Sequence, residues 1–309
     1  MWFAPRMRRA ALYRLAALAL ALPAAAVGEP LRFAILGDLP YFAWEALRLE
    51  QILDRMNGEP LAFVLHVGDI KGGEALCSDG MYLERRALFE RSAHPFFLLP
   101  GDNDWTDCHR ASNGGHDPLE RLAFLRRTFH GDESTLGRRM LHPLRQAGYP
   151  ENMRWELGEV VFVTVHAVGS HNGLGRSREG DAEYAARNAA NLEWLAAAFA
   201  TATHSGARGV VVAFHANPYF ERPAGSRARQ GYDDLVRALA NHGRGFARPV
   251  LVVHGDTHTY RLDRPLSIHG APDLKNVSRV ESFGSPTTGW VRVTVDPDRP
   301  ELFVVEPVP

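Results

Sequence analysis

Acidic and histidine side chains follow five of the apolar segments in this sequence, each within a few residues of the point where the segment ends. Short apolar runs of this kind predict buried strands, and a glycine before each of four aspartates permits a sharp exit from the strand. In an open α/β sheet the carboxyl ends of neighbouring strands meet along one edge, so residues distant in the sequence come together there. We therefore expect one cleft that holds six side chains: Asp38, Asp69, Asp102, His215, Asp256 and His258.

Four of these side chains are carboxylates, and like charges held close together cannot all stay ionised without a compensating positive charge. Few Lys or Arg residues lie near the motifs in the sequence, and Lys71 is the nearest. Asp and His are common ligands of divalent ions, and a pair of such ions can activate water and stabilise the oxygens of a displacement at phosphorus. The alternative is a set of turns, caps and core histidines, because Gly-Asp pairs are frequent in turns.

The elements that must position these residues alternate in type along the chain. Periodic apolar positions predict amphipathic helices over 44–56, 81–92, 118–129 and 188–201. Asp117 is the expected N-cap of the third helix. Short apolar runs predict strands over 31–36, 61–67, 95–99, 160–165, 210–214 and 250–253, with a closing hairpin over 291–295 and 302–305. Residues 130–155 are expected to be mostly loop, and residues 29–309 to form one α/β domain.

Residues 1–26 have the layout of a secretory signal peptide. Four arginines and no acidic residue precede an Ala/Leu-rich run, which Pro23 ends before three alanines. The apolar run is about half the roughly 20 residues that span a bilayer, and no later segment is long enough either. We therefore expect cleavage of this leader, no membrane anchor afterwards, and a periplasmic or secreted protein.

The composition excludes several classes of protein. Hydrophobic residues make up 45% and charged residues 23% of the 309, which excludes intrinsic disorder. The net charge is −1, or −5 without the four arginines of the leader, so no nucleic-acid-binding surface is expected. Cys77 and Cys108 are the only cysteines, and they predict a disulfide in an oxidising compartment. By reducing the entropy of the unfolded chain, a disulfide that closes a loop of this length would stabilise the folded protein by roughly 3.5 kcal/mol. Two buried free thiols are the alternative.

The polar motifs resemble those of the calcineurin-like metallophosphoesterases, a superfamily that includes the purple acid phosphatases. The resemblance spans about residues 33–258 and is carried by Gly37-Asp38, Gly68-Asp69, Pro100-Gly101-Asp102-Asn103-Asp104, His215 and Gly255-Asp256-Thr257-His258. It implies a four-layer α/β/β/α sandwich with mixed sheets, a C-terminal β hairpin and a dinuclear metal site. By this resemblance Asp38, Asp69 and His258 bind one metal. Asp69 bridges to a second metal, which Asp102, His215 and Asp256 hold.

The sequence departs from the family pattern at several positions. Pro40 stands where the first motif normally has a histidine, and proline cannot bind a metal. Asp102 replaces the usual Asn ligand and Asp256 the first His of the last motif, although both can bind metal. Asn103 stands where a histidine normally assists the leaving group. The purple subgroup has a tyrosine where this chain has Gly72, so the colour and iron of that subgroup are not expected.

These departures bear on the metal and on the substrate. Four carboxylates cancel the charge of two divalent ions, so we expect harder ions, namely Mn, Fe, Mg or Ca rather than Zn. The amide of Asn103 can donate a hydrogen bond but cannot protonate an alkoxide leaving group. Activated aryl esters should therefore react much faster than alkyl phosphates, unless another acid takes over; the candidates are His254, His109 and His171.

The sequence is interpreted as a metal-dependent phosphoesterase that hydrolyses a mono- or diester of a small phosphorylated substrate, with a metal-bridging hydroxide as nucleophile. Catalysis is assigned to Asp69, Asn103 and His254, although an ordinary core histidine explains His254 equally well. Pro40 and Asn103 keep a second interpretation open, in which a catalytically weakened protein of this fold binds a phosphorylated ligand or a partner. No motif selects one substrate or an oligomeric state.

Overall fold

The computed structural model describes residues 1–2, 30–268 and 272–309 of the chain. The expected leader, residues 1–26, therefore lies outside the described residues apart from Met1 and Trp2. Within the described part, no helix combines the length and the apolar character needed to cross a membrane.

Two mixed β-sheets form the centre of the molecule. The first has the strand order β12-β11-β1-β2-β3, and the second β4-β5-β6-β7-β8-β10-β9. The strands of the first sheet are β1 (Leu31–Leu36), β2 (Phe63–His66), β3 (Phe96–Leu98), β11 (Trp290–Val295) and β12 (Phe303–Val308). Those of the second are β4 (Leu144–Gln146), β5 (Tyr149–Leu157), β6 (Val160–Thr164), β7 (Gly209–Ala213), β8 (Val250–His254), β9 (Arg261–Asp263) and β10 (Val277–Glu281). The antiparallel pairing of β11 with β12 confirms the predicted C-terminal hairpin.

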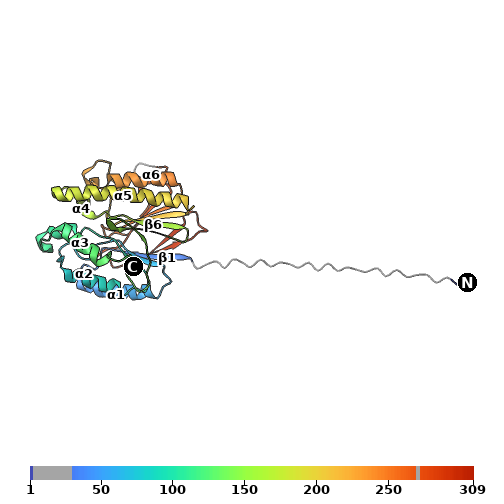
Figure 1. The fold of residues 1–309 in the computed structure, drawn as a ribbon, viewed down its shortest axis with the longest axis horizontal. Coiled ribbons are helices and arrows are strands. Elements are labelled where there is room, and N and C mark those ends of the chain that lie inside the picture. The colour runs from blue at the N-terminus through green and yellow to red at the C-terminus, as the bar shows by residue number, and fades with distance from the viewer. Residues whose placement is uncertain (3–29, 269–271) are drawn as a thin grey trace.

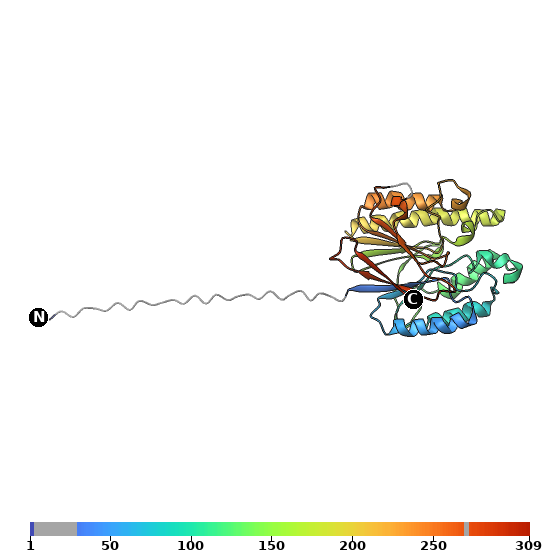
Figure 2. The same cartoon turned by 180° about the vertical axis from the view of Figure 1, so that it is seen from behind.

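Helices cover the outer face of each sheet, which gives the four layers that the resemblance implied. Figures 1 and 2 show α5 and α6 on one outer face and α1, α2 and α3 on the opposite face. The helices are α1 (Ala43–Asn57), α2 (Asp79–Phe89), α3 (Pro118–Phe129), α4 (Gly169–Asn172), α5 (Arg178–His204), α6 (Asp233–Phe246) and α7 (Pro265–Ile268). The carboxylate of Asp117 accepts the backbone N–H of Leu119 at 2.9 Å, as the predicted N-cap of α3 should.

The central strands are apolar on both faces because each face is buried against a different layer. Along β1, Phe33 and Ile35 belong to the core between the two sheets, whereas Ala34 and Leu36 belong to the core beneath the helices. This alternation follows from the two-residue repeat of a strand. Between the sheets, the ring of Phe63 lies edge-on to that of Phe162, with centroids 5.1 Å apart.

The prediction that residues 130–155 are mostly loop holds for 130–143, but it missed β4 and most of β5, which occupy the rest of this stretch. The polar residues of β5 interrupt the apolar pattern from which strands are predicted. Glu151 is buried in β5, where its carboxylate accepts hydrogen bonds from Arg126 and lies 2.7 Å from the ring nitrogen Nδ1 of His166. The strand is therefore stabilised by ladder bonds to β6 and by polar partners elsewhere in the chain, neither of which local hydrophobicity reports.

Helix α6 and strands β9 and β10 were also not predicted. The buried residues of α6 include Leu235, Val236 and Leu239, which recur at helical spacing, so the sequence does contain a signal for this helix. Strand β10 has buried residues along most of its length and pairs in parallel with β8, which places it inside the second sheet.

Cys77 and Cys108 form a disulfide, as predicted, with their Cα atoms 5.8 Å apart. Cys77 directly precedes the N-cap of α2, in the connection that follows β2, and Cys108 lies in a short 3₁₀ turn after β3. The bond therefore joins the two segments that carry Asp69 and Asp102.

Replacing both cysteines (C77A/C108A) should lower the free energy of unfolding by roughly 3.5 kcal/mol, because the unfolded chain regains the freedom of the closed loop. Chemical denaturation measures this difference. Wild-type protein treated with a reductant should lose a similar amount. An unchanged midpoint and slope in the double variant would contradict the prediction.

Candidate metal centre

The six side chains expected to share a cleft do come together, at the carboxyl ends of five strands. Asp38, Asp69 and Asp102 follow β1, β2 and β3 of the first sheet, and the other three follow β7 and β8 of the second. The site therefore lies where the same edge of both sheets meets. A backbone hydrogen bond from Asp38 to the carbonyl of Gly68, 2.9 Å long, links the first two loops directly.

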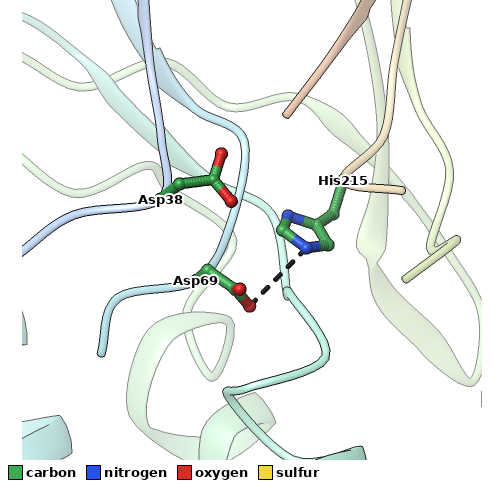
Figure 3. A group of neighbouring side chains, drawn as sticks. All are labelled: Asp38, Asp69 and His215. Atoms are coloured by element: carbon green, nitrogen blue, oxygen red, sulfur yellow. Dashed lines mark ion pairs between the residues drawn. The ribbon is translucent and has the colours of Figure 1, made fainter. Parts of the chain in front are cut away.

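Two groups of donor atoms have the spacing that a metal ion requires, with all ligand atoms in a group within 4.8 Å of one another. One consists of Asp38, Asp69 and His215, and the other of Asp102, His215 and Asp256. Figure 3 shows the first group, with the carboxylate of Asp69 facing the ring of His215. The Nε2 atom of His215 lies 3.0 Å from Oδ1 of Asp102, 3.6 Å from Oδ1 of Asp69 and 3.9 Å from Oδ1 of Asp256.

His258 belongs to neither of these groups, although the resemblance placed it with Asp38 and Asp69. Its Nε2 lies 3.7 Å from Oδ1 of Asp38 and 3.2 Å from the phenol oxygen of Tyr41. On the other side of the ring, Nδ1 faces the carbonyl oxygen of Ser285 at 2.6 Å. The side chain is thus at the edge of the cleft, next to the first group, and the residue shared by both groups is His215.

The two oxygens of Asp69 face different sides of the site. Oδ1 is the atom nearest to His215, and it accepts the backbone N–H of Asn103 at 3.0 Å. Oδ2 accepts the side-chain amide of Asn103 at 2.7 Å and the hydroxyl of Tyr41 at 2.9 Å. A carboxylate placed in this way could serve two ions. Asn103, which stands where the family has a histidine that assists the leaving group, holds Asp69 in position in this structure.

The backbone bends sharply at the site, and it does so at the residues predicted to bind metal. Asp38, Asp69, Asp256 and His258 all have φ between 54° and 82°, a region that costs a non-glycine residue about 1–3 kcal/mol. The Gly-Asp pairs in the sequence predicted these bends at the preceding glycines instead. Those glycines serve close packing as well: a Cβ on Gly101 would lie 2.0 Å from Oδ1 of Asp69.

Asp104 holds the strained loops without joining either donor group. Its carboxylate accepts three backbone N–H groups, from Asp69 at 3.0 Å, Ile70 at 2.8 Å and Gly101 at 2.7 Å. It therefore ties the loop after β2 to the loop after β3. Several hydrogen bonds to a fully buried carboxylate offset its loss of hydration.

Burial dominates the electrostatics of the acidic residues. It raises the pKa of Asp38 from 3.8 to about 8, and that of Asp256 to about 6 with a further contribution from the charge of Asp102. Burial also raises the pKa of Asp69 well above 3.8. At Asp102, the hydrogen bond and charge of His215 outweigh burial and lower the pKa.

His215 is the positive partner of this cluster in the absence of metal. Burial lowers the pKa of its ring, but the charge of Asp69 and the hydrogen bond to Asp102 outweigh that effect and raise it well above 6.5. Lys71 is buried nearby and donates to the carbonyl of Gly72 at 3.2 Å. In the metal-free protein, protons are therefore bound to carboxylate oxygens and to the imidazole of His215. These are the same atoms that could bind divalent ions. The donor set fits a dinuclear centre of oxygen-preferring metals.

The histidines considered as proton donors lie outside this set. His254 is buried at the end of β8, its Nδ1 lies 2.8 Å from the carbonyl oxygen of Gly255, and its ring is parallel to that of Phe214. Burial lowers its pKa to about 3, so the ring is neutral near pH 7. His109 and His171 are exposed. Another residue next to the site, Ser170, donates to Asp102 at 2.7 Å and was not predicted to do so.

Sequence comparisons found no match, either to a protein-family model or to a curated protein. Among solved structures, the chain is similar to a dimetal phosphatase from Danio rerio, with a TM-score of 0.57 at 13% identity over 91% of this chain and 96% of that one. This chain has the calcineurin-like metallophosphoesterase fold.

Two further structures resemble it less closely. A purple acid phosphatase from yellow lupin seeds has a TM-score of 0.49 at 14% identity, over 86% of this chain and 49% of that one. A phosphopantetheinyl hydrolase from Mycobacterium tuberculosis has a TM-score of 0.47 at 15% identity, over 84% and 92%.

The shifted pKa values predict how stability changes with pH in the metal-free protein. Asp38, with a folded pKa of about 8 against an ordinary 3.8, holds a proton that the unfolded chain releases, so stability falls as pH rises towards 8. His215 acts in the same direction above pH 6.5. Buried His66 and His254 have pKa values lowered from 6.5 to about 4 and about 3. They make stability rise with pH, but only below pH 6.5, where the unfolded chain protonates these rings.

In EDTA, the melting temperature should therefore fall between pH 6.5 and pH 8. Added Mn²⁺ should reduce or reverse that fall, because the ion replaces the protons as the partner of the carboxylates. Thermal unfolding at several pH values with and without Mn²⁺ measures both slopes. Identical slopes in the two series would contradict the assignment of these residues to a metal centre.

Proposed function

We propose that this protein is a metal-dependent phosphoesterase that hydrolyses a mono- or diester of a small phosphorylated substrate. The observation that carries the proposal is the convergence of four carboxylates from separate loops, three of them buried and that of Asp256 half-buried, on one imidazole, His215, in two groups with metal-ligand spacing. Burying several carboxylates together is costly unless cations accompany them. A purely structural role gives no reason for this arrangement at the strand ends of a metallophosphoesterase fold.

We divide the residues between two ions as the resemblance implies, with His258 beside the group of Asp38 and Asp69 and His215 within reach of both groups. Asp38, Asp69 and His258 would hold one, and Asp102, His215 and Asp256 the other, with one oxygen of Asp69 directed to each side. When bound, two divalent ions supply an activated water and stabilise charge on the phosphoryl oxygens. Asn103 keeps Asp69 in the orientation that this sharing requires.

The donor set also supports the proposal that the ions are Mn, Fe, Mg or Ca rather than Zn. Carboxylate oxygens outnumber imidazole nitrogens in both groups, and hard cations prefer oxygen. The four carboxylates leave less net positive charge for a phosphate dianion, so binding of substrate depends more on the residues lining the entrance.

A second candidate is a catalytically weakened protein that binds a phosphorylated ligand or a partner without hydrolysing it. The orientation of Asn103 favours it, since this amide donates to Asp69 and cannot itself protonate a leaving group. Such a protein would bind Mn²⁺ and phosphate in calorimetry and show no turnover.

The phosphoesterase proposal predicts a large difference between substrates. With Mn²⁺, p-nitrophenyl phosphate or its diester should be hydrolysed at least ~10²-fold faster than glycerol phosphate, because no general acid assists an alkoxide. Spectrophotometric and phosphate-release assays compare the rates. Asp69→Asn should abolish activity on both substrates, whereas Asp298→Asn, an exposed carboxylate far along the chain, should not.

Equal rates on the two esters would contradict the absence of a general acid. Failure of the folded wild-type protein to hydrolyse any ester with Mn²⁺, Fe²⁺, Mg²⁺ or Ca²⁺ would favour the binding protein.

We further propose that the chain is exported, with residues 1–26 as the cleaved leader. The Cys77–Cys108 disulfide supports this, because such bonds persist in oxidising compartments. Expression of the full chain in a Gram-negative bacterium followed by N-terminal sequencing tests it. The periplasmic protein should begin just after residue 26; retention in the cytoplasm with Met1 intact would contradict the proposal.

A further inference from the structure

Two arginines meet one buried carboxylate in the segment that follows β3. Asp107 is only 1% exposed, and its Oδ2 lies 2.6 Å from Nη2 of Arg110. Its Oδ1 contacts Nη2 of Arg176, whose Nη1 donates to the carbonyl oxygen of Thr106. Because arginine keeps its charge at any ordinary pH, two guanidinium groups on one carboxylate leave one positive charge in this group unbalanced.

A serine connects this group to the candidate metal centre. The hydroxyl oxygen of Ser170 lies 3.0 Å from Oδ2 of Asp107 and 2.7 Å from Oδ2 of Asp102, one of the six predicted metal ligands. The oxygen of Asp107 that faces Ser170 is also the oxygen that pairs with Arg110. The guanidinium of Arg110 therefore lies on the side of the cleft where Asp102 stands.

A second contact brings the same guanidinium close to the loop after β2. A Cβ at Gly73 would lie 3.7 Å from Nη1 of Arg110 and 3.2 Å from Oδ1 of Asn103, so these two side chains border the same small space. The amide of Asn103 donates in turn to Asp69. Arg110 is thus next to the side chain that holds the proposed bridging carboxylate.

Arg110 is the cation of this region that a ligand can reach. Its side chain is 44% exposed, against 25% for Arg176 and 1% for Lys71. Among the described residues, Nη1 of Arg110 has no hydrogen-bond partner, whereas both terminal nitrogens of Arg176 are engaged. A donor edge of the guanidinium is therefore available.

The chain around Arg110 is held on both sides. Its backbone N–H donates to the carbonyl of Asp107 at 3.0 Å, and its own carbonyl accepts the N–H of Asn113 at 2.9 Å. Cys108, two residues earlier, is joined to Cys77 by the disulfide. A guanidinium anchored in this way loses less conformational freedom when it binds an anion.

We propose that Arg110 binds a phosphoryl oxygen of the substrate and that the substrates of this site are phosphate monoesters. The inference rests on the proposed phosphoesterase and deepens it. A monoester has three free phosphoryl oxygens, of which a pair of ions accounts for two. The third is left for a guanidinium, which binds it by charge-assisted hydrogen bonds. In a diester that third oxygen is esterified and carries no charge.

The test compares Arg110→Ala with the wild type, both loaded with Mn²⁺. The dissociation constant of inorganic phosphate, measured by calorimetry, should rise at least about tenfold, because a charge-assisted hydrogen bond is lost. For p-nitrophenyl phosphate, kcat/KM should fall at least about tenfold, whereas for bis-p-nitrophenyl phosphate it should change by less than about threefold. Arg110→Lys, which keeps the charge without the planar fork, should recover part of the phosphate affinity.

The variant should fold, because Asp107 keeps its contacts with Ser170 and Arg176. Its melting temperature and Mn²⁺ affinity should equal those of the wild type, and a fall in either would overturn the assignment of Arg110 to the substrate.

Arg299→Ala is the matched control. Arg299 also pairs with an aspartate three residues earlier, since its Nε lies 3.3 Å from Oδ2 of Asp296. It lies in the turn after β11, whose last residue pairs with the first residue of β1, whereas the metal centre follows the other end of β1. This variant should match the wild type in every assay, and weaker phosphate binding in it would contradict a specific role for Arg110.

Failure of this inference is distinguishable from failure of the proposed function. Unchanged phosphate affinity in Arg110→Ala, or an equal loss of kcat/KM on both esters, would overturn the role of Arg110. Faster hydrolysis of the diester than of the monoester by the wild type would overturn the substrate class. All three results leave the phosphoesterase standing. Wild-type protein that binds neither Mn²⁺ nor phosphate would overturn both proposals.

Discussion

The central constraint on this structure is the free-energy cost of bringing four carboxylates together, largely away from water. Asp38, Asp69, Asp102 and Asp256 converge on the ring of His215, largely shielded from water, where burial pushes the pKa values of three of them upward. Such a cluster is stable only with bound cations, whether protons or metal ions. The same property that makes the site unfavourable without metal is the physical basis of the proposed metal binding, and the shared imidazole brings the two groups within reach of each other.

Much of the fold serves to hold this cluster in place. The edges of two sheets supply the loops, and the apolar core between the sheets fixes how far apart those loops begin. Asp104 and the disulfide both connect the loop after β2 with the loop after β3. Left-handed backbone at four ligand residues persists because these connections over-determine it.

The cleft also shows how a ligand set can be rearranged on a constant scaffold. Pro40 cannot bind a metal, yet the next residue, Tyr41, brings an oxygen to within hydrogen-bond distance of Asp69 and His258. Asn103 reaches the same two oxygens, of Asp69 and Tyr41, with its amide. By the resemblance, Asp256 stands where the last motif has a histidine, so it offers a carboxylate oxygen in place of a ring nitrogen, and oxygen donors favour harder metals.

The sequence by itself determined the fold class, the strands that end at the site, the disulfide pairing and the six converging residues. These follow from local features, namely apolar runs, glycines before aspartates and a single pair of cysteines. Strand β5 was missed because its buried Glu151 is stabilised by Arg126 and His166, far away in the chain. Only the tertiary structure decided that His215 is shared, that Asn103 clamps Asp69 and that Tyr41 enters the cleft. Side-chain direction depends on neighbours from other loops, and spacing along one chain does not contain that information.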